Sequence, residues 1–135
     1  MLKVTEIANN HVFYVYLCHW QSRLSGGEDE RIAKANKLSD SALEMIEDGH
    51  QVIAMGDFND EPSNKSLFSH LLATKCYNAI RKKPHSYFYN PFARVVHSGA
   101  PYCYLKNRVP RAVGSYYSSS TAKLPQCYYM FDQII

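Results

Sequence analysis

The feature that most constrains this chain is an apolar stretch that ends in a run of small and polar residues. Residues 51–55, Gln-Val-Ile-Ala-Met, predict a buried strand. The segment 56–62, Gly-Asp-Phe-Asn-Asp-Glu-Pro, follows and predicts the end of that strand. Asp57 and Asn59 are therefore expected at the carboxyl end of an inner strand, where open α/β sheets bind ligands. On an extended backbone, side chains two positions apart point the same way, so we expect both to reach one ligand.

Three interpretations of this motif were weighed. Asp and Asn often hydrogen-bond their own backbone, which would make the segment a simple turn. A calcium-binding loop needs Gly at its sixth position and Glu at its twelfth, where this chain has Pro62 and Phe68, and we exclude it. The third interpretation is a phosphodiesterase site, and it depends on what the rest of the chain supplies.

Length and composition indicate one globular domain spanning residues 1–135, with 46% hydrophobic and 20% charged residues. No apolar run reaches the length of a membrane span, and residues 1–4 do not open a secretory signal. We therefore expect the chain, as written, to stay in the cytoplasm. The four cysteines, at positions 18, 76, 103 and 127, form no CxxC pair, so a zinc knuckle is not indicated, and their disulfide state is left open.

The net charge of +3 hides a strong asymmetry along the chain. Residues 1–61 hold eleven of the twelve acidic residues, whereas residues 62–131 hold ten Lys or Arg and no acid. A basic half rich in tyrosine suits a phosphate-bearing polymer, which makes a non-catalytic nucleic-acid-binding fragment the alternative function. The structural alternative is a solvated face, because no basic cluster exceeds residues 81–83.

The hydrophobic patterns predict an α/β fold, because a helix separates two apolar strands in a crossover unit. In chain order the expected elements are a strand over 2–7, a turn at 9–10, a strand over 12–18, a helix from 28 to a C-terminal cap at Gly49, the strand over 51–55, a short helix over 65–72 capped by residues 63–64, short strands and long loops over 74–123, and a strand over 128–135.

Three stretches together resemble the endonuclease/exonuclease/phosphatase family, the superfamily of deoxyribonuclease I. They are residues 19–23 (His-Trp-Gln-Ser-Arg) after an apolar strand, residues 56–62, and residues 131–135 (Phe-Asp-Gln-Ile-Ile). The resemblance implies a partial deoxyribonuclease I-like two-sheet α/β sandwich that is incomplete at both termini.

The resemblance also implies a metal-dependent phosphoesterase, nuclease-like, that cleaves phosphodiester or phosphomonoester bonds. By position, Asp57 would orient or activate the attacking water, Asn59 would donate to a phosphate oxygen, His19 would contact the phosphate and Asp132 would support the site. Asp57 and Asn59 would also face the metal, and Arg23 would lie at the substrate while it packs and positions its neighbours. Mg²⁺ is the expected cofactor, with Mn²⁺ or Ca²⁺ as alternatives, because a phosphodiester is anionic and hydroxide must be generated locally.

Two departures from the family pattern limit what we expect of this chain. The early Asn and metal-binding Glu of the family have no counterpart before His19, and the late Asp-His pair does not occur after Asp132. We therefore expect the isolated chain to be weak or inactive, with apolar sheet edges exposed. His19 could also be an ordinary strand-end histidine and Asp132 a buried hydrogen-bonding carboxylate. The substrate (nucleic acid, phospholipid head group or sugar phosphate) and the oligomeric state are left open.

Overall fold

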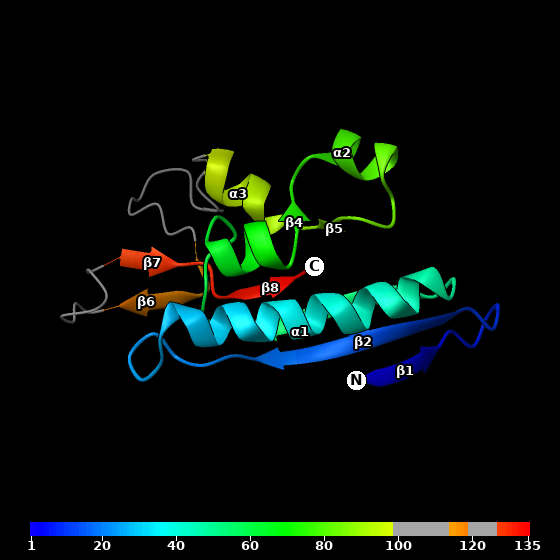
Figure 1. The fold of residues 1–135 in the computed structure, drawn as a ribbon, viewed down its shortest axis with the longest axis horizontal. Helices are drawn as coiled ribbons and strands as arrows, with labels where there is room; N and C mark the ends of the chain where they lie inside the picture. The colour runs from blue at the N-terminus through cyan, green and yellow to red at the C-terminus, as the bar shows by residue number, and fades with distance from the viewer. Residues whose placement is uncertain (99–113, 119–126) are drawn as a thin grey trace.

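A computed structural model describes residues 1–98, 114–118 and 127–135 of the chain, and its centre is a four-stranded mixed sheet (Figure 1). The strand order is β1-β2-β3-β8. The strands are β1 (Leu2–Thr5), β2 (Val12–His19), β3 (Gln51–Asp57) and β8 (Asp132–Ile134). β2 and β3 are parallel, whereas the two outer strands run antiparallel to their neighbours.

The first two strands form the predicted hairpin. β1 pairs with β2 in the register Leu2 to Val15. The turn between them contains Asn10 with a φ of 57°, a left-handed conformation that asparagine tolerates better than most residues. The His11 N–H donates to Asn9 Oδ1 over 2.9 Å, so the Asn-Asn pair closes the turn with its own side chain.

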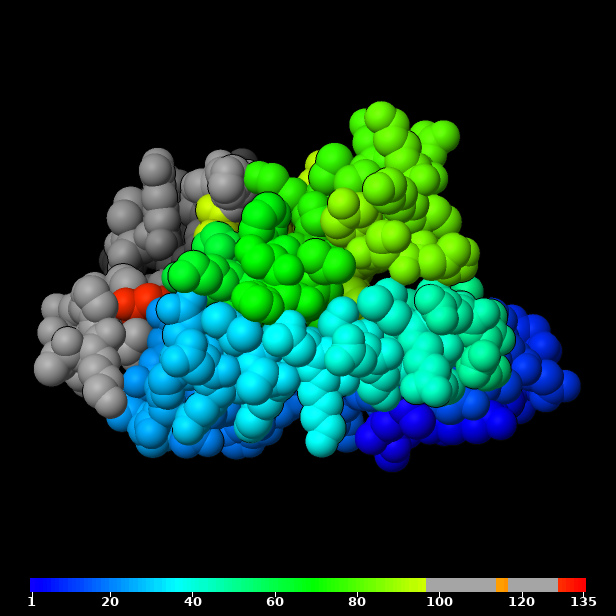
Figure 2. Space-filling model, in the orientation of Figure 1, coloured from blue at the N-terminus to red at the C-terminus, as the bar shows by residue number. Residues whose placement is uncertain are grey.

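Helix α1 (Glu28–Glu47) connects the two parallel strands and covers one face of the sheet (Figures 1 and 2). Three acidic residues in its first turn complement the positive end of the helix. The chain leaves the helix through Gly49 at a φ of 84°, which confirms the predicted C-terminal glycine. The strand–helix–strand crossover, and with it the α/β class, is as predicted.

The main core lies between α1 and the sheet. It joins small residues of the helix to aromatic and aliphatic residues from the strands and from the segment after β3. Its fully enclosed members are Ala35, Ala42, Phe58, Leu67 and Leu71, each with 0% exposure.

Within the described part of the chain, the opposite face of the sheet is apolar but largely uncovered. Leu17, Met55 and Ile134 are successive cross-strand partners, so their side chains share this face. Leu17 is 65% exposed and Ile134 is 47% exposed. The sequence led us to expect exposed apolar sheet edges, whereas the exposed apolar residues described here share a face of the sheet.

The remaining elements are short. They are η1 (Ser66–His70, one π-helical turn), β4 (Ala73–Thr74), α2 (Tyr77–Lys82), β5 (Phe88–Tyr89), α3 (Phe92–Ser98), β6 (Tyr116–Ser118) and β7 (Cys127–Tyr129). β4 pairs with β5, and β6 pairs with β7, as two separate two-stranded sheets. None of the helices in the described ranges combines the length and hydrophobicity that crossing a bilayer requires.

The predictions for the second half of the chain need three corrections. Helices α2 and α3 occur where strands and loops were expected, and residues 99–113 and 119–126 of that stretch lie outside the described residues. α3 begins because Asn90 Oδ1 accepts the N–H groups of Phe92 and Ala93, an N-terminal cap followed by proline.

The helix after Pro62 is shorter than predicted, and Asn64 does not cap it with its side chain, which donates to Asp60 instead.

The strand predicted over 128–135 is two strands in different sheets. The break falls at residues 130–131. Ser115 Oγ accepts the N–H groups of Phe131 and Asp132 there, which ends the pairing of β7 and lets β8 join the central sheet.

Candidate functional site at the end of the central sheet

Three of the predicted site residues meet where the central strands end. His19 on β2 and Asp57 on β3 are direct Cα partners, and Asp57 is also the Cα partner of Asp132 on β8. Neighbouring strands lie about 4.8 Å apart, and directly paired residues place their side chains on the same face. The imidazole and the two carboxylates therefore form a row across three strands.

This row lies on the face that α1 does not cover. The next residue on each parallel strand, Trp20 and Phe58, points to the opposite side and is buried under the helix. Their rings meet edge to face with centroids 4.9 Å apart. Because the two aromatic residues are anchored there, His19 and Asp57 are directed outward, and His19 and Asp132 are exposed to solvent.

The chain turns sharply after Asp57, which corrects one expectation from the sequence. Asn59 has a φ of 49°, so the backbone is not extended, and Asp57 and Asn59 do not point the same way as strand neighbours would. Asp57 Oδ1 accepts the Asn59 N–H over 2.8 Å, the self-bonded Asp turn that was one of the three interpretations of the motif. Asp57 Oδ2 accepts no hydrogen bond from the described residues.

The Asn59 side chain is buried, with 8% exposure, and links the two site loops. Its Nδ2 donates to the main-chain carbonyl of Trp20 over 3.0 Å. A carboxamide carries two N–H groups, so one donor remains after this bond. In the opposite direction, the Trp20 N–H donates to the Asp57 carbonyl over 2.9 Å, which ties the ends of β2 and β3 together.

Gly56 allows the two parallel strands to approach at the site. Its φ is +132°, and a Cβ at this position would lie 2.1 Å from the Cys18 carbonyl oxygen. No side chain fits there without moving the backbone of β2. Gly56 therefore belongs to the strand interior rather than ending it, and β3 continues through Asp57.

Arg23, predicted at the substrate, has its guanidinium group engaged within the protein. Nε donates to the Asn59 carbonyl over 3.1 Å, and Nη2 forms an ion pair with Asp60 Oδ1. The guanidinium carbon also lies 5.2 Å from the centre of the Phe131 ring, within cation–π range.

Asp60 is the residue of this region that the sequence did not single out. It is 1% exposed, and its carboxylate accepts hydrogen bonds from Arg23, Asn64 and Ser66. Three Asp and Glu side chains fall in the motif, and nothing in their spacing distinguishes the buried one. Ser66, six residues later, donates to Asp60, but only the structure shows that both residues are buried.

The comparisons with known proteins bear on this geometry. Residues 1–108 match the family model described as "Endonuclease/Exonuclease/phosphatase family". The chain belongs to this family. No curated protein matches the chain, and no solved structure does.

Members of the endonuclease/exonuclease/phosphatase family are generally hydrolases of phosphoesters and typically use divalent metals. The mixed α/β architecture described above is consistent with a partial deoxyribonuclease I-like fold.

The side chains at the sheet end are of the type that binds a hard cation, but the described ones are too few to hold it. Asp57 and Asp132 supply carboxylate oxygens, which Mg²⁺ prefers. Within residues 1–98, 114–118 and 127–135, however, no three His, Cys, Asp or Glu side chains come together closely enough to hold a metal. The described residues of this family member therefore do not form a complete metal site.

Two titratable groups next to the row have shifted pKa values. Burial raises the pKa of Glu61, Arg23 opposes the shift, and Asp60 adds to it. Burial also raises the pKa of Cys18 to about 11, so this thiol stays protonated at neutral pH and does not act as a thiolate.

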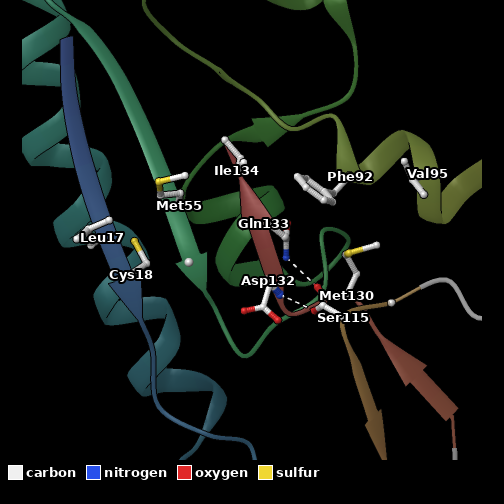
Figure 3. A pocket seen from close by; sticks show the side chains of 12 residues that line it. Leu17, Cys18, Met55, Phe92, Val95, Ser115, Met130, Asp132, Gln133 and Ile134 are labelled. Atoms are coloured by element: carbon white, nitrogen blue, oxygen red, sulfur yellow. Dashed lines mark hydrogen bonds between the residues drawn. The ribbon is translucent and has the colours of Figure 1, made fainter. Parts of the chain in front are cut away.

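A cavity of about 890 Å³ opens on the uncovered face beside the row (Figure 3). Its lining is mostly apolar, from Leu17, Met55, Phe92, Val95, Met130 and Ile134. Asp132 lies on its border and its N–H donates to Ser115, as Figure 3 shows. The row of site residues thus lies at the border between an apolar surface and solvent.

Proposed function

We propose that this chain carries one side of the active site of a phosphoesterase that hydrolyses phosphodiester or phosphomonoester bonds. The observation that carries the proposal is the register of the central sheet, which makes His19, Asp57 and Asp132 cross-strand neighbours. An imidazole beside two carboxylates, open to solvent, provides a donor for an anionic phosphate and acceptors for a water.

Asp57 is the proposed acceptor for the attacking water. Its Oδ1 is occupied by the Asn59 N–H, so the carboxylate is held in one orientation. Oδ2 is left to hydrogen-bond a water and to draw a proton from it as the water attacks phosphorus.

His19 and Asn59 are the proposed phosphate contacts. The exposed His19 ring would donate to one phosphate oxygen. Asn59 would donate with the N–H that Trp20 does not use. Asp132, on the far side of Asp57, would accept hydrogen bonds from waters that surround the leaving group.

Mg²⁺ is the cofactor proposed on grounds of family membership, with Asp57 and Asn59 as the proposed oxygen donors and Asp132 as the cross-strand neighbour of Asp57. The described donors are too few to hold the ion, so we expect weak Mg²⁺ binding by the 135-residue chain and little or no turnover. Calorimetric titration that gives tight binding of Mg²⁺ to this chain would contradict the expectation.

Replacement of Asp57 tests the function itself. In the full-length protein, Asp57→Asn should lower kcat for an aryl phosphodiester at least about 100-fold, because the water loses its acceptor. The folded state should persist, since an amide oxygen can still accept the Asn59 N–H. Asp40→Asn, an exposed acid on α1, is the matched control and should behave as wild type. Wild-type turnover by Asp57→Asn would remove the assignment.

A further inference from the structure

The buried carboxylate of Asp60 brings together segments that are far apart in the chain. Oδ1 accepts from Arg23 in the loop after β2 and from Asn64 ahead of η1. Oδ2 accepts from Ser66 and lies 3.2 Å from Nε of Arg31 in the first turns of α1. Three hydrogen bonds therefore reach the carboxylate, while Arg31 Nε is within ion-pair distance but makes no hydrogen bond within the described residues.

Arg23 connects the Asp60 carboxylate to the two loops that carry the site. The planar guanidinium group presents its N–H groups in a fixed fork, so two acceptors bound by it are held at a set spacing. One acceptor is the Asp60 carboxylate and the other is the carbonyl of Asn59. Arg23 lies four residues after His19, so this fork fixes the loop that follows the imidazole against the loop that follows Asp57.

The main chain of Asp60 reaches the third strand. The Asp60 carbonyl accepts from Gln133 Nε2 over 2.7 Å, and the same nitrogen donates to the Met130 carbonyl over 3.0 Å. Gln133 Oε1 accepts from Asn90, whose own oxygen caps α3. Gln133 is 2% exposed and follows Asp132 directly. The hydrogen bond from Gln133 to Asp60 therefore also fixes the position of β8 and of the Asp132 carboxylate.

We infer that Asp60 is a positioning residue of the candidate active site, acting through Arg23 on the His19 loop and through Gln133 on β8. The inference rests on the proposed function, and it reassigns Arg23 from the substrate to the support of the site. Removing one partner of a buried ion pair leaves the other charge unpaired and destabilises the fold, so a variant that keeps the charge is needed to separate positioning from stability.

The test compares Asp60→Asn and Arg23→Lys with Lys65→Met in the full-length protein. Asp60→Asn keeps the shape of the side chain and removes its charge, while Arg23→Lys keeps the charge and loses the fork. Lys65 forms an exposed ion pair with Glu28 at 3.9 Å and is the matched control. Turnover of an aryl phosphodiester with Mg²⁺ gives kcat and KM, and ¹H–¹⁵N NMR of the 135-residue chain gives the Asn59 amide shift.

We expect Asp60→Asn to lower kcat about 100-fold with KM close to wild type, because misplaced groups act on the transition state. Arg23→Lys should lower kcat in the same way, and both should move the Asn59 amide resonance. Lys65→Met should change neither kcat nor the resonance. If Asp60→Asn does not fold, Arg23→Lys still decides the inference.

Two outcomes would overturn the inference, and they are distinct from failure of the proposed function. Wild-type kcat in both variants, with activity lost in Asp57→Asn, would leave the function standing and remove the role of Asp60. If Asp57→Asn keeps full turnover, the function fails, and the Asn59 resonance alone then decides positioning. An unmoved resonance in both variants would exclude it.

Discussion

The two faces of the central sheet are built from similar strand residues but have different environments. One face is buried under α1, and the other is largely exposed in the described part of the chain. Under α1, Ala54 and Phe58 are at most 1% exposed. On the other face, Leu17 is 65% exposed although it lies on the same pair of strands. His19, Asp57 and Asp132 lie on the open face, whereas Asn59, Asp60 and Gln133 are buried.

Residues at one strand end therefore have two different roles: some face solvent at the site, and others pack in the core. Successive side chains at the end of β3 point to opposite faces of the sheet, so Asp57 points outward to solvent and Phe58 points inward to the core. Burial fixes the position of the inward residues and of the backbone between them. The outward residues are attached to the same backbone, so their positions are fixed as well. The open face borders a cavity of about 890 Å³ and leaves Leu17 exposed, which gives room for a ligand or another surface.

The largest expected effect tests the energetic difference between the faces. Phe58→Ala should lower the free energy of unfolding by about 3–5 kcal/mol, because it leaves a cavity in the core. Leu17→Ala removes exposed side-chain atoms and should change it by about 0.5 kcal/mol or less. Urea unfolding measures both. Similar losses for the two variants would show that the open face is covered in solution.

Gly56→Ala tests how closely β2 and β3 approach each other at the site end of the sheet. The new Cβ meets the Cys18 carbonyl oxygen and the φ is +132°, so we expect a loss of about 3 kcal/mol or more. Gly49→Ala is the matched control, since its φ is also positive but nothing lies within 4 Å of the added carbon. There we expect a loss of about 1 kcal/mol, from backbone strain alone. Thermal or urea unfolding that gives equal losses would contradict the close strand contact.

The smallest expected effect concerns pH and the half-buried Glu61 beside the Asp60 cluster. Its pKa is raised above 4.5 in the folded state, so the folded protein binds the proton more tightly than the unfolded chain. The stability that this proton contributes is complete below pH 4.5 and is lost as pH rises through the raised pKa. Glu61→Gln should therefore stabilise the protein relative to wild type near pH 7 and less so near pH 4. A stability difference that does not vary between these pH values would show that Glu61 is solvated.

Elements with a strong local signal could be predicted from the sequence. The hairpin follows from alternation and the Asn9–Asn10 turn, and α1 follows from its acidic first turn and Gly49. The register that pairs His19 with Asp57 follows from two parallel strands that end in polar motifs. Helix α3 was missed although Asn90-Pro91 is a helix-start signal, because the scattered prolines around it indicated loops.

The residues that fix the site geometry could not be chosen from the sequence. Asn59 adopts a left-handed conformation and bonds the Trp20 carbonyl, which depends on a strand 39 residues earlier. Asp60 and Glu61 are adjacent acids with the same local pattern, yet one is enclosed by two arginines and the other is half exposed. Such differences arise from contacts between distant segments, and no local periodicity encodes them.

The sequence by itself determined the α/β class, the order of the central elements and the types of side chain at the sheet end, because strand alternation, helix ends and turn residues act over a few positions. Only the tertiary structure decided which acid is buried, that Arg23 binds Asp60 and the Asn59 carbonyl, and that Leu17 is exposed while Phe58 is enclosed. Those outcomes depend on burial, and burial is set when β2, β3, β8 and α1 pack together.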